Sequence, residues 1–428
     1  MYRSFLSVAF MAAALALSAQ LSVHRVWVLN EGRFDYMTQT QEVPVSLGAY
    51  DPSTGAYQHV LTLSGPRFGN DLEVKDAVVY VAADDQLLKI DADSHMILAQ
   101  VTVPGIRRIA LWNDQVLLTR GELGGLSHYF EARQQADLAL IYELAPGNGP
   151  DHASEDVQVV GDEAYIAINN GFDWPNYTGQ IGVVDLPTGT YVNEIDLGPN
   201  GKNPERIFEA NGDLFVFNNK DFSGSSISRL APAAATLHYT QDIALNSGCG
   251  ASALVDGRIY YLEYALYQMG RFDISTGQVL DTLSSPLAPY AILQDSHNGV
   301  VYMTTTDFAT SGELHVTDEL GNVLSTVAVG VSPGNMALDL RSSTAVADDA
   351  EQKRMALYPN PAVDQVWLSG AEAGAWITVL DATGRRVQAM RTVPQDGPVL
   401  IDLAGLAPGS YTVQAGDGRT GRLQVVRP

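Results

Sequence analysis

The chain has 428 residues, of which 46% are hydrophobic and only 17% are charged. Acidic residues outnumber basic ones by 49 to 25, and the resulting net charge of −24 argues against nucleic acid or an anionic membrane surface as the main partner, because both attract basic patches. The single cysteine, Cys249, excludes an internal disulfide framework and a cysteine-based zinc site.

The first 20 residues have the pattern of a secretory signal peptide. Arg3 supplies a positive charge, residues 6–17 form an alanine-rich apolar run, and the small residues Ser18 and Ala19 follow. About 12 apolar residues are too few to span the ~30 Å hydrocarbon core of a bilayer. We therefore expect residues 1–20 to direct export through the periplasm, and no transmembrane segment; a buried N-terminal helix is the alternative.

Residues 21–340 consist of short alternating strands broken by Gly, Asn, Asp and Pro, with almost no helical periodicity. Four strands every ~44 residues are typical of a β-propeller. We therefore predict an all-β, seven-bladed β-propeller in which the last entry strand pairs with the first blade and closes the ring. Six or eight blades, or a two-sheet sandwich, are the alternatives. A loop followed by a short apolar strand recurs seven times, with the strand motifs starting at residues 70, 107, 155, 205, 251, 289 and 334.

The composition changes after the propeller region. Residues 355–428 carry six basic and six acidic residues, whereas the acidic excess lies before them. The polar segment 341–354 lacks aromatic residues and is typical of a linker. We therefore expect a separate small C-terminal domain at 355–428.

The C-terminal region carries a distinctive set of motif residues: Tyr358, Pro359, Asn360, Pro361, Asp364, the stretch 381–385 with Gly384, and the stretch 406–411 with Gly409 and Tyr411. In these residues it resembles the type A C-terminal sorting domain of the type IX secretion system of Bacteroidetes. The resemblance implies a small Ig-like β-sandwich that is recognised by the secretion machinery, so that the protein is released or held at the outer cell surface. The chain departs from the family in ending on Pro428, where a lysine is usual.

Five stretches of the propeller region are also distinctive: residues 28–32, 47–51, 69–71, 198–204 and 332–334. In these stretches the region resembles the YncE-like family, in particular its branch of Bacteroidetes surface proteins. The resemblance implies a propeller at the cell surface, and in some members of that branch a corrinoid ligand that is passed to a transporter.

Each entry strand has a polar residue at the second position of its motif. In a propeller the entry strand lines the central channel, so these side chains are predicted to form a polar ring at the channel mouth. Arg108 and Arg206 would clamp a carboxylate or phosphate there. The alternative is that acid–arginine pairs tie neighbouring blades together. The ring consists of Asp71, Arg108, Asp156, Arg206, Ser252, Tyr290 and Asn335.

Aromatic residues in the longer loops are candidates for stacking on a sugar or ring system, or for contact with a protein. The alternative is that each loop folds back against its own blade. The candidates are Phe172, Trp174, Tyr177, Phe222, Tyr264 and Tyr267.

Catalytic and metal-binding signals are weak. The eight histidines are scattered without metal-ligand spacing, and the chain has no nucleophile elbow or phosphate-binding loop. We therefore expect no cofactor and no metal, and a non-enzymatic protein that binds a corrinoid-like molecule, a glycan or a surface protein at the channel mouth. His152 precedes the fourth blade's entry strand and is the one histidine placed near that mouth. Two alternatives remain: an extracellular hydrolase or lyase that uses His152 with Glu155 or Asp156, and a structural or adhesive surface protein.

Overall fold

The computed structural model describes residues 21–220, 224–243, 251–263, 268–283, 287–342, 356–369, 374–391, 399–416 and 419–427. The expected signal peptide (1–20), most of the expected linker, and Phe222, Tyr264 and Tyr267 lie outside these residues. Within them the chain is all-β, apart from one short 3-10 helix, η1 (Pro232–Ala234).

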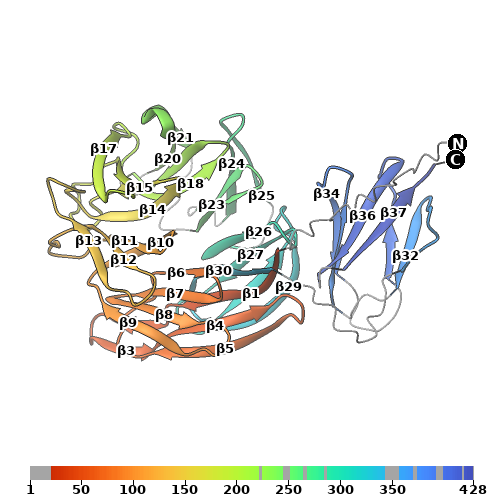
Figure 1. The fold of residues 1–428 in the computed structure, drawn as a ribbon, viewed down its shortest axis with the longest axis horizontal. Helices are drawn as coiled ribbons and strands as arrows, with labels where there is room; N and C mark the ends of the chain where they lie inside the picture. Colours follow the sequence, from red (N-terminus) through yellow and green to blue (C-terminus); the bar gives the residue numbers. More distant parts are fainter. Residues whose placement is uncertain are drawn as a thin grey trace, which may run out of the picture.

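Seven four-stranded antiparallel sheets follow one another in the described part of residues 21–342 (Figure 1). In six of them the four strands are consecutive in the chain and in space. These six contain β6 (Asp71–Lys75), β7 (Val78–Ala83), β8 (Gln86–Asp91) and β9 (Ile97–Thr102); β10 (Ile106–Trp112), β11 (Gln115–Arg120), β12 (Phe130–Gln134) and β13 (Leu140–Leu144); β14 (Ser154–Val160), β15 (Glu163–Ile168), β16 (Gln180–Asp185) and β17 (Thr190–Asp196); β18 (Pro204–Ala210), β19 (Asp213–Asn218), β20 (Ser225–Ala231) and β21 (Thr236–Ile243); β22 (Ser252–Val255), β23 (Arg258–Glu263), β24 (Gln268–Asp273) and β25 (Gln278–Leu283); and β26 (Ala291–Asp295), β27 (Val300–Thr305), β28 (Ser311–Thr317) and β29 (Val323–Val331).

The remaining sheet joins the two ends of this region. Its order is β30 (Pro333–Ser342), β1 (Leu21–Asn30), β4 (Val45–Asp51) and β5 (Ala56–Leu63). The register pairs Leu21 with Ser342 and Val28 with Met336, so strands more than 300 residues apart form one ladder. A two-stranded hairpin, β2 (Arg33–Asp35) and β3 (Thr40–Val43), is inserted between β1 and β4.

The innermost strands of the seven sheets contact one another in a cycle. The order is β6, β10, β14, β18, β22, β26 and β30, and β30 contacts β6 again. Figure 1 shows these strands facing a common centre, with the outer strands radiating from it.

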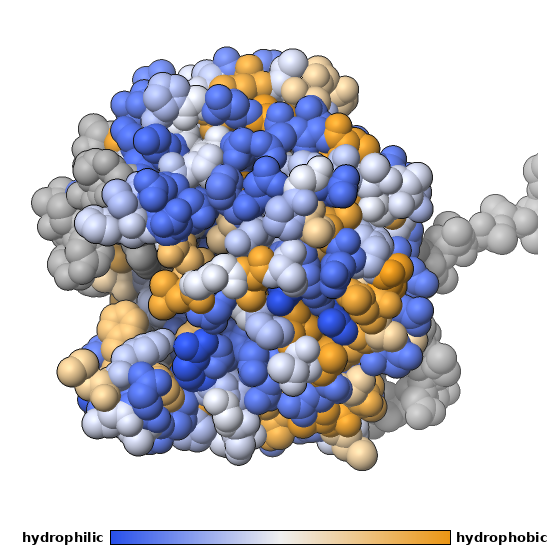
Figure 2. Space-filling view, turned by 90° about the vertical axis from the view of Figure 1, so that its left-hand side faces the viewer, coloured by the Kyte–Doolittle hydropathy of each residue, from blue (hydrophilic) through white to orange (hydrophobic). Residues whose placement is uncertain are grey.

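The second strand of each sheet explains where the core lies. These strands are almost wholly apolar and buried because a sheet covers each of their faces. In the first core cluster, Trp27 and Leu47 of one sheet pack against Val81 and Ile90 of the next. The outer strands instead alternate, as in β9, and Figure 2 accordingly shows hydrophobic residues in small groups among predominantly hydrophilic ones on the side it displays.

Aspartates at the ends of third strands cap the turns that follow. Asp51 accepts hydrogen bonds from the backbone N–H and the hydroxyl of Ser53, and Asp185 does the same with Thr188. The glycine that completes each turn, Gly55 or Gly189, has a positive φ, which other residues adopt at a cost. The recurrent aspartate and glycine of the sequence are thus explained by turn chemistry.

The C-terminal residues form two sheets around their own core. Trp376 is buried in a cluster that contains Val300 and Tyr302, and Arg386 forms an ion pair with Glu319. This region therefore packs against the sheet of β26–β29, which is the seventh sheet in chain order. The three-stranded sheet contains β31 (Ala356–Tyr358), β32 (Gln365–Ser369) and β35 (Val399–Asp402), and the four-stranded sheet contains β34 (Arg386–Arg391), β33 (Trp376–Leu380), β36 (Gly409–Ala415) and β37 (Thr420–Val425).

Candidate functional site

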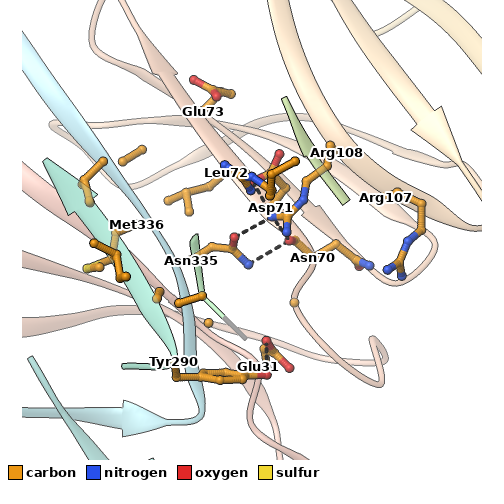
Figure 3. Close-up of a pocket in the computed structure, with 18 of the residues that line it drawn as sticks. Glu31, Asn70, Asp71, Leu72, Glu73, Arg107, Arg108, Tyr290, Asn335 and Met336 are labelled. Atoms are coloured by element: carbon orange, nitrogen blue, oxygen red, sulfur yellow. Dashed lines mark hydrogen bonds and ion pairs between the residues drawn. The ribbon is translucent and has the colours of Figure 1, made fainter. Parts of the chain in front are cut away.

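A cavity of about 510 Å³ lies among the innermost strands. Six of the seven residues predicted to form the polar ring line it, and Figure 3 shows several of them facing one another. The seventh, Asp156, is buried beside Arg206. The six are Asp71, Arg108, Arg206, Ser252, Tyr290 and Asn335.

Arg108 joins the first strands of three sheets. Its Nη1 donates to Oδ1 of Asn335 at 2.7 Å and to the carbonyl oxygen of Asn70 at 3.1 Å, and lies 3.3 Å from Oδ1 of Asp71 (Figure 3). The Asn335 amide in turn donates to the same Asn70 carbonyl at 2.8 Å. These contacts hold β6, β10 and β30 together at one side of the cavity.

Two ring aspartates bond the backbone of the next sheet. Oδ2 of Asp71 accepts from the N–H of Ile109 at 2.8 Å, and Oδ2 of Asp156 accepts from the N–H of Ile207 at 2.7 Å. Both carboxylates are buried, so each satisfies a buried donor that would otherwise be unpaired. These carboxylate–backbone bonds join neighbouring sheets. Each aspartate also lies within ion-pair distance of an arginine of the next sheet, Arg108 or Arg206, which is the arrangement that the alternative to ligand binding described.

Strict alternation along the entry strands does not predict three further charged residues that line the cavity: Arg107, Glu155 and Glu205. The pairing of β10, β14 and β18 with their neighbours is irregular at these residues, with register shifts after Ile106, Ser154 and Pro204. A β-bulge of this kind re-aims side chains, so two adjacent residues of one strand can face the same space. Adjacent charged residues at the start of three entry strands were the signal in the sequence.

The three arginines of the cavity differ in how completely they are paired. Arg107 donates from Nε and Nη2 to the two carboxylate oxygens of Glu155, both at 2.8 Å. In contrast, Nε of Arg206 is buried without a hydrogen-bond partner in the described part of the chain and lies 3.7 Å from Asp156. Nε of Arg108 is unpartnered too, but its Nη1 is bonded to three groups, whereas no side-chain hydrogen bond of Arg206 is found among the described residues. Arg206 therefore retains the most capacity to bind an added group.

Three glutamates line the cavity without an arginine bonded to them among the described residues. Burial raises the pKa of Glu31 to about 7, although the Tyr290 hydroxyl donates to it at 2.8 Å. Burial, with the nearby charge of Asp71, raises the pKa of Glu73 to about 8. Burial and the charge of Glu155 raise the pKa of Glu205 to about 7, and the Asn219 amide donates to it. Near neutral pH a substantial fraction of these carboxyl groups is therefore protonated, and the protonated form can donate as well as accept a hydrogen bond.

The predicted loop aromatics and His152 fall in different places. Phe172 lines a second, smaller cavity of about 200 Å³, whereas the Trp174 side chain is 75% exposed and Tyr177 is half-buried. His152 is exposed and does not line either of these cavities. The hydrolase alternative requires His152 to pair with Glu155 or Asp156. Within the described chain the His152 ring forms no ion pair with either residue.

The motif residues of the C-terminal region have structural contacts. The Asn360 amide donates to the Arg422 carbonyl at 2.7 Å, and its oxygen accepts from the Gln424 N–H at 2.9 Å. The Tyr411 hydroxyl donates to the Ala407 carbonyl at 2.7 Å. The remaining motif residues lie beside strands or in turns: Tyr358 ends β31, Pro359 and Pro361 flank Asn360, Gly384 has a positive φ, and Gly409 begins β36.

Among the described residues there is no group of three or more His, Cys, Asp or Glu placed to hold a metal ion. The same residues contain no helix long and apolar enough to cross a membrane.

Residues 356–425 match the family of secretion system C-terminal sorting domains. No curated protein matches the chain. A sorting domain of this kind engages the secretion machinery, and it indicates that the protein is exported to the cell surface or secreted.

Proposed function

We propose that this exported protein is a non-enzymatic binding protein. In this proposal residues 21–342 form a seven-bladed β-propeller of the YncE-like type whose central cavity holds a small polar molecule. The Ig-like sorting domain that follows directs the protein through the type IX system to the outer surface, after a signal peptide has taken it across the inner membrane.

The cyclic contacts of the innermost strands support the propeller. Seven four-stranded sheets fit the ~44-residue repeat, and the ladder between β1 and β30 joins the ends of the region. Propellers close their ring in this way, which leaves only short, protected sheet edges.

The binding function is carried by one observation: the cavity is lined mainly by polar groups with capacity left to bond. Three cavity-lining groups are buried without a hydrogen-bond partner in the described part of the chain: Nε of Arg206, Nε of Arg108 and the hydroxyl of Ser252. Buried polar groups are usually paired, so unpaired ones that face a cavity of this size suit a ligand that completes them.

The test is thermal unfolding of the mature full-length chain against corrinoids, nucleotides, amino acids and neutral saccharides. A ligand at 100 times its Kd adds about 2.7 kcal/mol to the free energy of unfolding, which raises the melting temperature measurably. We expect one class to raise it, and Arg206→Gln to abolish that rise.

The matched control is Arg229→Gln, because Arg229 pairs with Asp213 and does not line the cavity. The rise should persist in that variant. If no class raises the melting temperature, or if Arg206→Gln retains the full rise, the cavity is not the binding site.

A further inference from the structure

A second cavity of about 200 Å³ opens beside the first. Its walls come from loops of four different sheets and from the hairpin of β2 and β3. Phe68 and Arg107 line both cavities, so the two cavities are adjacent. We call the smaller cavity the slot; the residues used below are Tyr36, Arg67, Phe68, Asp84, Arg107, Gly121, Glu122, Leu123 and Phe172.

The slot combines exposed apolar surface with a fixed aromatic ring. The side chains of Tyr36 and Leu123 are 59% and 74% exposed although they line a cavity. The Phe172 ring lies 5.3 Å from the Arg107 guanidinium carbon and packs on Gly121, where an added Cβ would be only 2.6 Å from the ring. The contacts with Gly121 and Arg107 hold the ring in one place at the wall of the slot.

The charged groups of the slot are paired with one another, two guanidinium groups against three carboxylates. Arg67 donates to both oxygens of Asp84, at 2.6 and 2.8 Å, and to Glu122 at 3.2 Å. Arg107 is bonded to both oxygens of Glu155. Since every guanidinium here has a carboxylate, the slot has no unpaired positive charge to attract an anion. Its edges still offer planar donors and acceptors for hydrogen bonds.

Taken together, an aromatic ring with hydrogen-bonding edges and no unpaired positive charge matches the chemistry of a sugar ring. A pyranose presents C–H groups on its face and hydroxyls on its edge, and the hydroxyls both donate and accept. The carboxyl, guanidinium and amide groups of the larger cavity suit further hydroxyls.

We propose that the ligand is a neutral oligosaccharide, with one sugar ring in the slot stacked at Phe172 and the next ring in the central cavity. This inference rests on the proposed binding function and deepens it. It also assigns Phe172, rather than its exposed loop neighbour Trp174, as the residue that recognises chain length.

The test is isothermal titration of the full-length chain with maltotriose, xylotriose and chitotriose, each beside its monosaccharide. One trisaccharide should bind at least tenfold more tightly than its monosaccharide. Phe172→Ala should weaken the trisaccharide roughly tenfold, in line with the energy of an aromatic contact, and leave the monosaccharide unchanged. Phe172→Trp should restore trisaccharide binding.

Trp174→Ala is the matched control, since Trp174 is on the same loop and lines neither cavity. Equal affinities for the trisaccharide and the monosaccharide, or equal effects of the two alanine variants, overturn the inference. Failure of every saccharide also overturns it, but leaves the proposed function standing if another class binds in an Arg206-dependent way. Failure of every class overturns both.

Discussion

Glu73 is a cavity residue whose ionisation the fold changes strongly. It lies two residues after Asp71 on the same strand, so both carboxyl groups face the centre. Burial and the charge of Asp71 raise its pKa to about 8, and the side chain is therefore mainly neutral at pH 7. A neutral carboxyl group donates one hydrogen bond and accepts others.

The raised pKa of Glu73 makes stability depend on pH. The folded state binds this proton more tightly than the unfolded state, so the stabilisation is complete below the ordinary pKa of 4.5 and is lost as the pH rises through about 8. Glu73→Gln removes the ionisation, and we expect it to lose less stability than the wild type between pH 5 and pH 8.5 in urea unfolding. Glu209→Gln, at an exposed position, is the control. Parallel pH profiles for wild type and Glu73→Gln would contradict the assignment.

Asp71 is expected to contribute stability as well as to line the cavity. Asp71→Ala leaves the buried N–H of Ile109 without its acceptor and removes a carboxylate beside Arg108. We expect the free energy of unfolding to fall by about 1–3 kcal/mol, measured by urea unfolding. Asp162→Ala, an exposed turn position, should change it by less than about 0.5 kcal/mol. Similar small changes in both variants would show that the inter-sheet bond is dispensable.

Alternation along a strand was enough to place most of the ring residues, because it depends only on the period of two. It missed Arg107, Glu155 and Glu205, because a bulge places two consecutive residues on one side and its position depends on pairing with the next strand. Glu31 was missed because it follows β1 and lies outside the entry motifs. Its place in the cavity depends on the ladder with β30, which brings Gly334 beside it.

At the scale of elements, β30 completes the first sheet and also contacts β26 and β6. A chain that ends at residue 331 lacks this strand and exposes the backbone of β1 along with the buried Trp27. We expect it to lose the cooperative thermal transition, measured by circular dichroism. A chain that ends at residue 342 keeps β30 and should keep the transition. Retention of a sharp transition without β30 would mean that closure is not needed for folding.

Elements were predictable where the turn chemistry was local. The aspartate and glycine turns and the entry strands follow from short patterns in the sequence. Residues 128–144 match the repeat less clearly in the sequence, and the structure shows that they supply the two outer strands β12 and β13. The hairpin of β2 and β3 was not predicted, because no repeat contains it.

At the scale of the whole molecule, the excess of 24 negative charges destabilises the compact state by self-repulsion. Raising the ionic strength from 10 to 150 mM shortens the screening length from about 30 to about 8 Å, so the melting temperature should rise. Sodium chloride and tetramethylammonium chloride at equal ionic strength should give the same rise. An unchanged melting temperature, or a rise with only one salt, would point to a specific ion effect instead.

The sorting region was recognisable from its motifs, and the match to residues 356–425 confirms that part of the sequence analysis. Its contact with the seventh sheet was not predictable. From its sequence alone Trp376 would be assigned to the core of its own domain, yet it is buried with Val300 and Tyr302. The pairing of Arg386 with Glu319 likewise depends on how the two regions pack. The YncE-like resemblance and the identity of the ligand stay predictions.

The ladder between β1 and β30 also determines how the ring responds to force. Leu21 pairs with Ser342, so the segments before and after the ring leave from the same end of one antiparallel ladder. A pull that separates these two ends loads the hydrogen bonds one pair at a time, as when a zipper opens, whereas a pull along the strands would load many together. The circle of seven sheets is therefore expected to be mechanically weakest at the β1–β30 ladder, from which the sorting domain extends. Tension applied there would open the sheet of β30, β1, β4 and β5 before the other six.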